Sequence, residues 1–171
     1  MIIEERVERS QYVKLITWIV SFIILMAGIV FPVLILWVNQ DMMSKVIGAS
    51  VLCLIFFTLI FTVAYQPRKL ILSETHIIME RILGQVYISY SDITDISLYH
   101  RENVAEIRIF GIGGLGGYIG KFYNSKIGFY TAYVGDYSQA FLIKINNREK
   151  YVMSCRQPKG TESTERIVLL R

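Results

Sequence analysis

The residues of this chain that come closest to a chemical motif are glycines in its C-terminal half. Gly111, Gly113 and Gly116 have the spacing G-x-G-x-x-G, and Asp136 follows 20 residues after the last of them. In a dinucleotide site, these glycines precede a helix whose N-terminus holds the pyrophosphate. Residues 118–123 are instead rich in aromatic residues and contain another glycine, so no helix is expected to begin there. We therefore predict no nucleotide binding, and we interpret the glycines as a turn or bulge with positive φ or close backbone approach.

Candidate catalytic and metal-binding side chains are isolated from one another. His76 and His100 lie 24 positions apart with no matching carboxylate or cysteine spacing, and Cys155 has no histidine near it in sequence. A metal site needs several ligands at regular spacing, and a reactive thiol needs a neighbouring base or cation. We therefore expect no enzyme activity, no metal and no cofactor, with Cys155 as a buried and inert thiol. Cys53 lies in an apolar segment far from Cys155, so no disulfide is expected, which suits a reducing compartment.

Aromatic and basic residues are interleaved in the segment that follows the glycines. Such patches can bind single-stranded nucleic acid or a membrane surface, although alternating aromatics in strands more often form core and cross-strand pairs. We favour the core for the set as a whole, and we name four members as partner-binding candidates: Lys121, Phe122, Tyr123 and Lys126. The net charge of +4 arises entirely after residue 67 and is scattered, which argues against a nucleic-acid partner.

Two long uncharged segments precede these motifs. Residues 15–38 contain 24 consecutive residues without a charge, and residues 46–66 contain 21 more. About 20 helical residues cross the hydrocarbon core of a bilayer, so each segment is long enough to span it. The connection of residues 39–45 is short, which makes the two helices antiparallel neighbours. Neither segment carries a charged residue of the kind that marks ion pathways and transport sites, so we interpret the pair as an anchor.

The flanks of these segments predict their orientation. Lys and Arg are more frequent in the N-terminal tail and after the second segment than in the connecting loop, where Lys45 stands alone. The positive-inside bias then places both termini in the cytoplasm of an inner-membrane protein. The aromatic rings near the segment ends prefer the headgroup level, and the two basic residues at the exit can touch anionic headgroups or simply set the topology. We expect five residues to contact the membrane surface: Trp18, Trp37, Tyr65, Arg68 and Lys69.

After Lys69 the pattern changes to short β-branched and aromatic runs separated by turn residues, which is typical of an antiparallel sheet or barrel. We expect strands near residues 69–73, 76–81, 85–90, 93–99, 105–110, 128–134, 140–145 and 150–154. Thr161 is placed to cap a short C-terminal helix. The segments ISYSDI (88–93), RIFGIGG (108–114) and YVMSC (151–155) resemble bacterial pleckstrin-homology-like (PH-like) domains, over residues 68 to 171.

Together with the two uncharged segments, this resemblance implies a two-helix transmembrane hairpin followed by an antiparallel β PH-like barrel with a short C-terminal helix. It brings no catalytic residues with it. The phosphoinositide site of eukaryotic PH domains relies on basic residues around the first hairpin loop. Here that loop is Ser73-Glu74-Thr75, which is short and acidic, so this departure puts that particular site in doubt.

The chain then divides into a cytoplasmic tail (1–14), a first transmembrane helix (15–38), an extracytoplasmic loop (39–45), a second transmembrane helix (46–66) and a cytoplasmic PH-like β domain (67–171). We expect a membrane-anchored binding or scaffolding module whose partner is a protein, a second copy of the chain, or the membrane surface. The alternative is an accessory subunit of a larger membrane complex, in which the hairpin is the main interaction element. Exchange of the hairpin for an unrelated one would preserve activity only in the first case.

Overall fold

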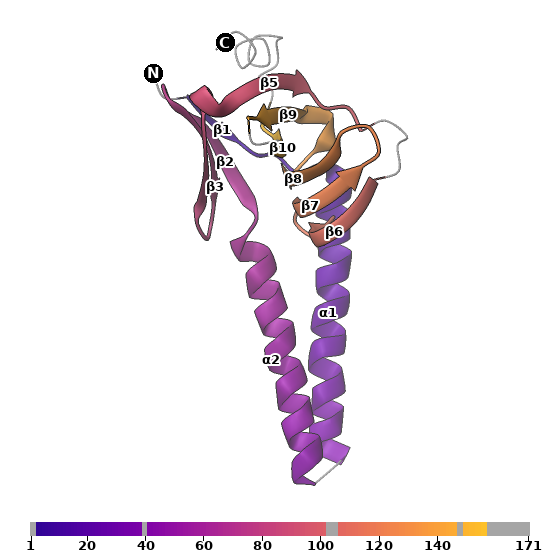
Figure 1. Ribbon diagram of the computed structural model, residues 1–171. Coiled ribbons are helices and arrows are strands. Elements are labelled where there is room, and N and C mark those ends of the chain that lie inside the picture. The colour runs from indigo at the N-terminus through magenta and orange to yellow at the C-terminus, as the bar shows by residue number, and fades with distance from the viewer. Residues whose placement is uncertain (1–2, 39–40, 102–105, 147–148, 157–171) are drawn as a thin grey trace.

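The structure is a computed structural model that describes residues 3–38, 41–101, 106–146 and 149–156. Two long helices form a hairpin that projects from one end of a β-rich domain (Figure 1). The predicted C-terminal helix falls outside the described residues. The arrangement agrees with the predicted fold class, in which two apolar helices precede a β domain of PH type.

The helices are α1 (Gln11–Val38) and α2 (Met42–Ala64), and both are long and apolar enough to cross a bilayer, with mean hydropathies of 2.7 and 2.6 in their candidate spans. Helix α1 begins before the predicted residue 15 because the hydroxyl of Ser10 accepts a hydrogen bond from the amide of Val13 at 3.2 Å. Helix α2 begins before the predicted residue 46 because the carboxylate of Asp41 caps the amide of Ser44 at 2.9 Å. Both caps use polar residues that lie outside the uncharged segments.

The two helices approach closely at small residues. Gly28 and Gly48 are both buried, and a Cβ at Gly28 would lie 2.9 Å from the Ile55 Cδ1 atom. Many large apolar side chains of the helices are exposed, among them Trp18, which is 78% exposed, and Phe22, which is 63% exposed. An exposed apolar surface of this extent is costly in water and suits a hydrocarbon environment.

The strands form two sheets (Figure 1). The four-stranded sheet has the order β1-β2-β3-β4, with β1 (Ile3–Arg6), β2 (Pro67–Leu72), β3 (His76–Arg81) and β4 (Gln85–Ser89). The six-stranded sheet has the order β5-β9-β10-β8-β7-β6, with β5 (Ile93–Leu98), β6 (Glu106–Gly113), β7 (Tyr118–Asn124), β8 (Gly128–Val134), β9 (Ala140–Ile145) and β10 (Lys150–Ser154). Neighbouring strands are antiparallel except β8 and β10, which run parallel.

Alternation along the strands builds a core on each face of the six-stranded sheet. Between the two sheets lies a cluster that includes Leu70, Met79 and Ile143, each 0% exposed. The opposite face carries a second cluster that includes Val152 and Ala132. Adjacent residues of one strand therefore pack into different cores. For this reason the sequences of these strands are nearly continuous apolar runs.

Two strands were not predicted. The tail assigned to residues 1–14 contains β1, which pairs with β2 in a register that sets Arg6 opposite Lys69. Its four residues are mostly charged, so they carry no apolar alternation that would reveal a strand. No strand was predicted at β7, which pairs closely with β6: Gly111 of β6 and Gly120 of β7 oppose each other, and a Cβ at either would lie within 2.3 Å of a carbonyl oxygen on the other strand. The predicted turn with positive φ is confirmed between β6 and β7, where Gly114, Gly116 and Gly117 have positive φ, and the predicted close backbone approach is confirmed at Gly111.

Candidate functional site

The domain is fastened to the helices by a set of contacts that we call the joint: Arg9, Thr17, Gln66 and Gly116. The Thr17 hydroxyl accepts a hydrogen bond from the amide of Gly116 at 2.8 Å, across 99 positions of sequence. The Arg9 guanidinium donates to the amide oxygen of Gln66 at 2.6 Å. Gln66 follows the end of α2, and Thr17 lies in the second turn of α1. The tip of the β6–β7 hairpin is thus wedged between the two helices where they leave the domain.

Gly116 explains the last glycine of the G-x-G-x-x-G motif. Its φ is +74°, and a Cβ there would lie 1.9 Å from Gln66 Nε2 and 2.6 Å from Gln66 Cδ. Any other residue would have to displace the Gln66 side chain, which Arg9 holds in place. Because the motif lies on a hairpin between two strands, it has no helix N-terminus with which to hold a phosphate.

The segment between β1 and α1 is also bound along its length. The amide of Val7 donates to the carbonyl of Arg68 at 3.0 Å, and that of Ser10 donates to the carbonyl of Gly135 at 3.2 Å. Gly135 is required at this crossing, since a Cβ there would lie 2.2 Å from the carbonyl oxygen of Glu8. Both helices therefore enter the domain without a flexible linker, so that the barrel has a fixed height above the helix ends.

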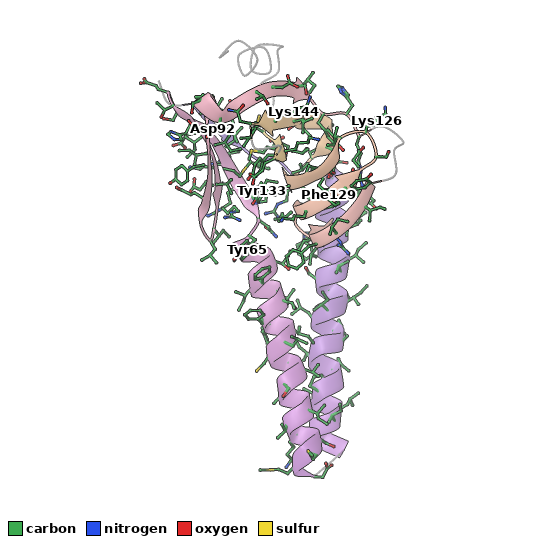
Figure 2. All side chains as sticks on the ribbon, in the orientation of Figure 1. Tyr65, Asp92, Lys126, Phe129, Tyr133 and Lys144 are labelled. Atoms are coloured by element: carbon green, nitrogen blue, oxygen red, sulfur yellow. The ribbon has the colours of Figure 1, made fainter. Side chains whose placement is uncertain are left out.

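A second hairpin meets the end of α2. The amide of Leu83, in the β3–β4 turn, donates to the carbonyl of Ala64 at 2.8 Å. Ile82 and Leu83 are 51% and 56% exposed, so this turn presents two apolar side chains beside the helix exit. The guanidinium of Arg81 lies 5.3 Å from the ring centroid of Tyr65, and Figure 2 shows Tyr65 where α2 meets the domain.

The expected membrane-contact residues lie at different places on the helices. Trp18 and Trp37 are exposed near opposite ends of α1. Tyr65 is half-buried, with its ring 4.3 Å from that of Phe61. Of the two basic residues, Arg68 is exposed, and Lys69 forms an ion pair with Glu4 at 3.1 Å. Among these five, Tyr65, Arg68 and Lys69 are brought together beside the exit of α2.

The four partner-binding candidates do not share one surface. Lys121 and Lys126 are exposed, and Tyr123 is half-buried in a ring contact with Phe129 at 5.0 Å. Phe122 is only 3% exposed and stacks on Tyr130 at 5.8 Å, so it belongs to the core. Assigning Phe122 to a binding surface was wrong, because alternation along β7 points Lys121 and Tyr123 outward and Phe122 inward.

A polar cluster lies at the edge of the second core. The Tyr137 hydroxyl donates to the Glu106 carboxylate at 2.9 Å, and Arg101 forms an ion pair with Glu106 at 3.2 Å. The Arg101 guanidinium also lies 4.7 Å from the Tyr137 ring centroid. Burial raises the pKa of Tyr130 and of Tyr137 well above the ordinary tyrosine value, so both phenols stay protonated. The cluster packs at the edge of the core, which agrees with the prediction that most aromatic residues of this segment belong to the core.

The histidines and cysteines lie in different environments: Cys53 is exposed and Cys155 is buried. Burial raises the pKa of the Cys155 thiol to about 11, which disfavours the reactive thiolate. His76 forms a hydrogen bond with the Thr75 hydroxyl at 2.7 Å, and His100 is exposed. Within the part of the chain that the structure describes, no group of three or more His, Cys, Asp or Glu side chains could hold a metal ion.

Comparison with known proteins identifies a family that matches the β domain. Residues 68–166, more than half of the chain, match the model of a family described as "Bacterial PH domain". No curated protein and no solved structure matches the chain. The match begins directly after the exit of α2 and covers strands β2 to β10, so the helices and β1 lie outside it.

Proposed function

The chain belongs to the bacterial PH domain family, whose members share a fold that generally binds rather than catalyses, and on that premise we propose a membrane-anchored binding module whose barrel rests on the bilayer surface. In this proposal α1 and α2 cross the membrane, and the barrel lies on the cytoplasmic side. The Lys and Arg bias of the flanks supports that orientation.

The observation that carries the proposal is the joint. Because Thr17 and Gly116 are bonded directly, the tip of the β6–β7 hairpin lies at the height of the second turn of α1. Once α1 is inserted in a bilayer from about residue 15, this tip must lie within the headgroup region. The PH-like domain then has no freedom to move away from the membrane, and its surface near the helices must be compatible with lipid.

The surface beside the helices has that compatibility. Ile82 and Leu83 flank α2, and Trp18 is exposed on α1 one residue after Thr17. Phe110, which is 73% exposed, lies in β6 three residues before the end of that strand, and the end of β6 adjoins the joint. Each apolar side chain that enters the bilayer interface contributes favourably, and full burial of such a side chain is worth about 1.5–3 kcal/mol.

A protein partner remains part of the proposal. The exposed residues Lys121 and Lys126, with Tyr123 between them, lie on or next to β7, whose neighbour β6 is an edge strand with unpaired backbone groups. A module fixed at one height would present this surface to other membrane proteins at high effective concentration. The same surface could serve a second copy of the chain.

Immersion depth tests the proposal. Nitroxide labels at Leu83→Cys and Lys144→Cys, in a Cys53→Ser background and in neutral phosphatidylcholine bilayers, would be compared for contact with oxygen and with a water-soluble nickel complex. We expect the label at position 83 to report the headgroup level and the label at position 144 to report water, because Lys144 lies at the end of the domain away from the helices (Figure 2). Equal, water-like accessibility at both positions would contradict the proposal.

A further inference from the structure

An open groove of about 520 Å³ lies where the four-stranded sheet meets the helices. We call it the basic groove, and it is lined by Arg6, Val7, Arg9, Pro67, Arg68, Lys69 and Glu80. Pro67 comes three residues after the last residue of α2, and Arg9 comes two residues before the first residue of α1. The groove therefore opens beside the ends of both helices.

Strand register gathers the charges of the groove on one face. Arg6 pairs with Lys69, and Lys69 pairs with Glu80, so the three side chains form a row across β1, β2 and β3. Strict alternation would send Arg68 to the core face together with Leu70. The register shifts between Pro67 and Lys69, which makes Arg68 the extra residue of a β-bulge. A bulge re-aims the side chain at this position, and Arg68 is exposed and lines the groove.

The groove has an excess of positive charge, and some of its basic side chains are not paired with an acidic residue. Four of its lining residues are basic, and Glu80 is the one acidic residue among them. Lys69 is paired with Glu4, and Arg9 is bonded to Gln66. Within the described residues, Arg6 and Arg68 form no ion pair and no side-chain hydrogen bond, and both are exposed. Two guanidinium groups without an ion pair on one concave surface have the charge and the hydrogen-bond donors that an anion requires.

The shape of the guanidinium group specifies the anion further. Its planar fork matches two oxygens of a phosphate and binds them through paired charge-assisted hydrogen bonds. The Glu80 carboxylate cannot contact the phosphate itself, but it can accept a hydrogen bond from a hydroxyl group attached nearby. The groove is therefore suited to a phosphate ester that carries a hydroxyl, as the glycerol headgroup of an anionic phospholipid does.

From these contacts we infer that the basic groove binds the phosphate of an anionic headgroup through Arg6 and Arg68. That the anion belongs to a lipid depends on the proposed function, in which the barrel lies on the bilayer surface. That the groove binds an anion does not depend on it. This site lies outside the first hairpin loop of the PH-like fold, where Ser73-Glu74-Thr75 is acidic. It depends on β1, which comes from the segment before the first helix.

Native mass spectrometry of the full-length chain in neutral detergent tests the inference. The chain would be titrated separately with phosphatidylglycerol, with phosphatidylcholine of the same acyl length and with inorganic phosphate. The variants are Arg68→Gln and Arg6→Gln/Arg68→Gln, and the control is Lys144→Gln, which removes a partly exposed cation, paired with Asp95 at 2.8 Å, at the far end of the domain. Neither Arg6 nor Arg68 belongs to the joint, so both variants should fold.

We expect phosphatidylglycerol to bind more tightly than phosphatidylcholine. Each guanidinium removed should weaken phosphatidylglycerol binding about fivefold, and Lys144→Gln should leave it unchanged. If inorganic phosphate binds as tightly as phosphatidylglycerol and responds to the same variants, the anion site stands and its source is free phosphate. If the two lipids bind equally and the double variant behaves as the wild type does, the inference is overturned. The depth measurement at position 83 uses neutral lipid. The proposed contact of the barrel with the bilayer and the proposed anion site can therefore be contradicted independently.

Discussion

Replacing Phe122 by alanine is expected to lower the free energy of unfolding of the domain by about 3–5 kcal/mol. Phe122 is 3% exposed and packs among Tyr130, Ala132 and Val134, so its removal would leave a cavity in the second core. Cores are packed closely, and neighbouring side chains relax only partly into such a cavity. The measurement is denaturant unfolding of the full-length chain in detergent, followed by near-ultraviolet circular dichroism of the aromatic residues.

The neighbouring residue supplies the control for this substitution. Tyr123→Ala removes a half-buried ring whose main partner is the exposed Phe129, so we expect a loss of about 1 kcal/mol. If Phe122→Ala were as stable as the wild type, Phe122 would be free to act on the surface, as its position in a basic and aromatic segment first indicated. The two adjacent substitutions therefore separate a core role from a binding role.

Gly116→Ala is expected to cost about 3 kcal/mol and to loosen the attachment of the barrel to the helices. About 1 kcal/mol or more comes from a positive φ that alanine tolerates poorly. The rest comes from the Cβ, which would lie 1.9 Å from Gln66 Nε2. Gln66 would have to move and lose its hydrogen bond with Arg9. Limited proteolysis between Gln66 and Arg68, together with thermal unfolding, would measure both effects.

Gly84→Ala is the matched control for the joint. Gly84 has a φ of +82°, close to that of Gly116, but a Cβ there would meet only the flexible end of Arg81 at 3.4 Å. We expect a cost of about 1 kcal/mol and unchanged proteolysis at the helix exit. Equal losses in the two variants would mean that backbone strain alone explains the effect at Gly116, and that the contact with Gln66 contributes nothing.

Much of the fold follows from local pattern, and the parts that do not follow depend on distant pairing. Strands β3, β8, β9 and β10 begin and end at the predicted residues, because β-branched and aromatic runs between turn residues mark them clearly. The existence of both helices follows from the absence of charge over a length that no core helix requires. Their first residues were misplaced because Ser10 and Asp41 cap them from within polar segments.

The candidate site could be predicted from the sequence only in part. Arg68 and Lys69 were correctly noticed as cations beside the second helix, but nothing in the local sequence pairs Lys69 with Arg6, which lies 63 residues earlier. The bulge that turns Arg68 outward breaks the alternation on which strand assignment relies. In the same way, the reason for Gly116 lies in Gln66 and Thr17, and a motif search considers only residues near it in sequence.

In the proposed arrangement, the joint gives the two-helix hairpin a role beyond anchoring. Since Thr17, Arg9 and Gln66 bind the helices directly to the barrel, a tilt or rotation of either helix would be transmitted to the β6–β7 hairpin. The basic groove shares Arg9 with the joint, so the two sites have one residue in common. An exchange of the two-helix hairpin for an unrelated one should therefore keep Thr17 and Gln66. Only the helical residues after Thr17 and before Gln66 should be replaced.

The most direct test of the account is the sidedness of the two ends of the molecule. One cysteine would be introduced, either at Met43, which is 74% exposed beside the connection of the helices, or at Lys144. The background carries Cys53→Ser and keeps the buried Cys155, and the background alone is the labelling control. Intact cells would then be treated with a thiol reagent that does not cross membranes. We expect labelling of Met43→Cys in intact cells and labelling of Lys144→Cys only after permeabilisation. Labelling of Lys144→Cys in intact cells, or protection of Met43→Cys, would contradict it.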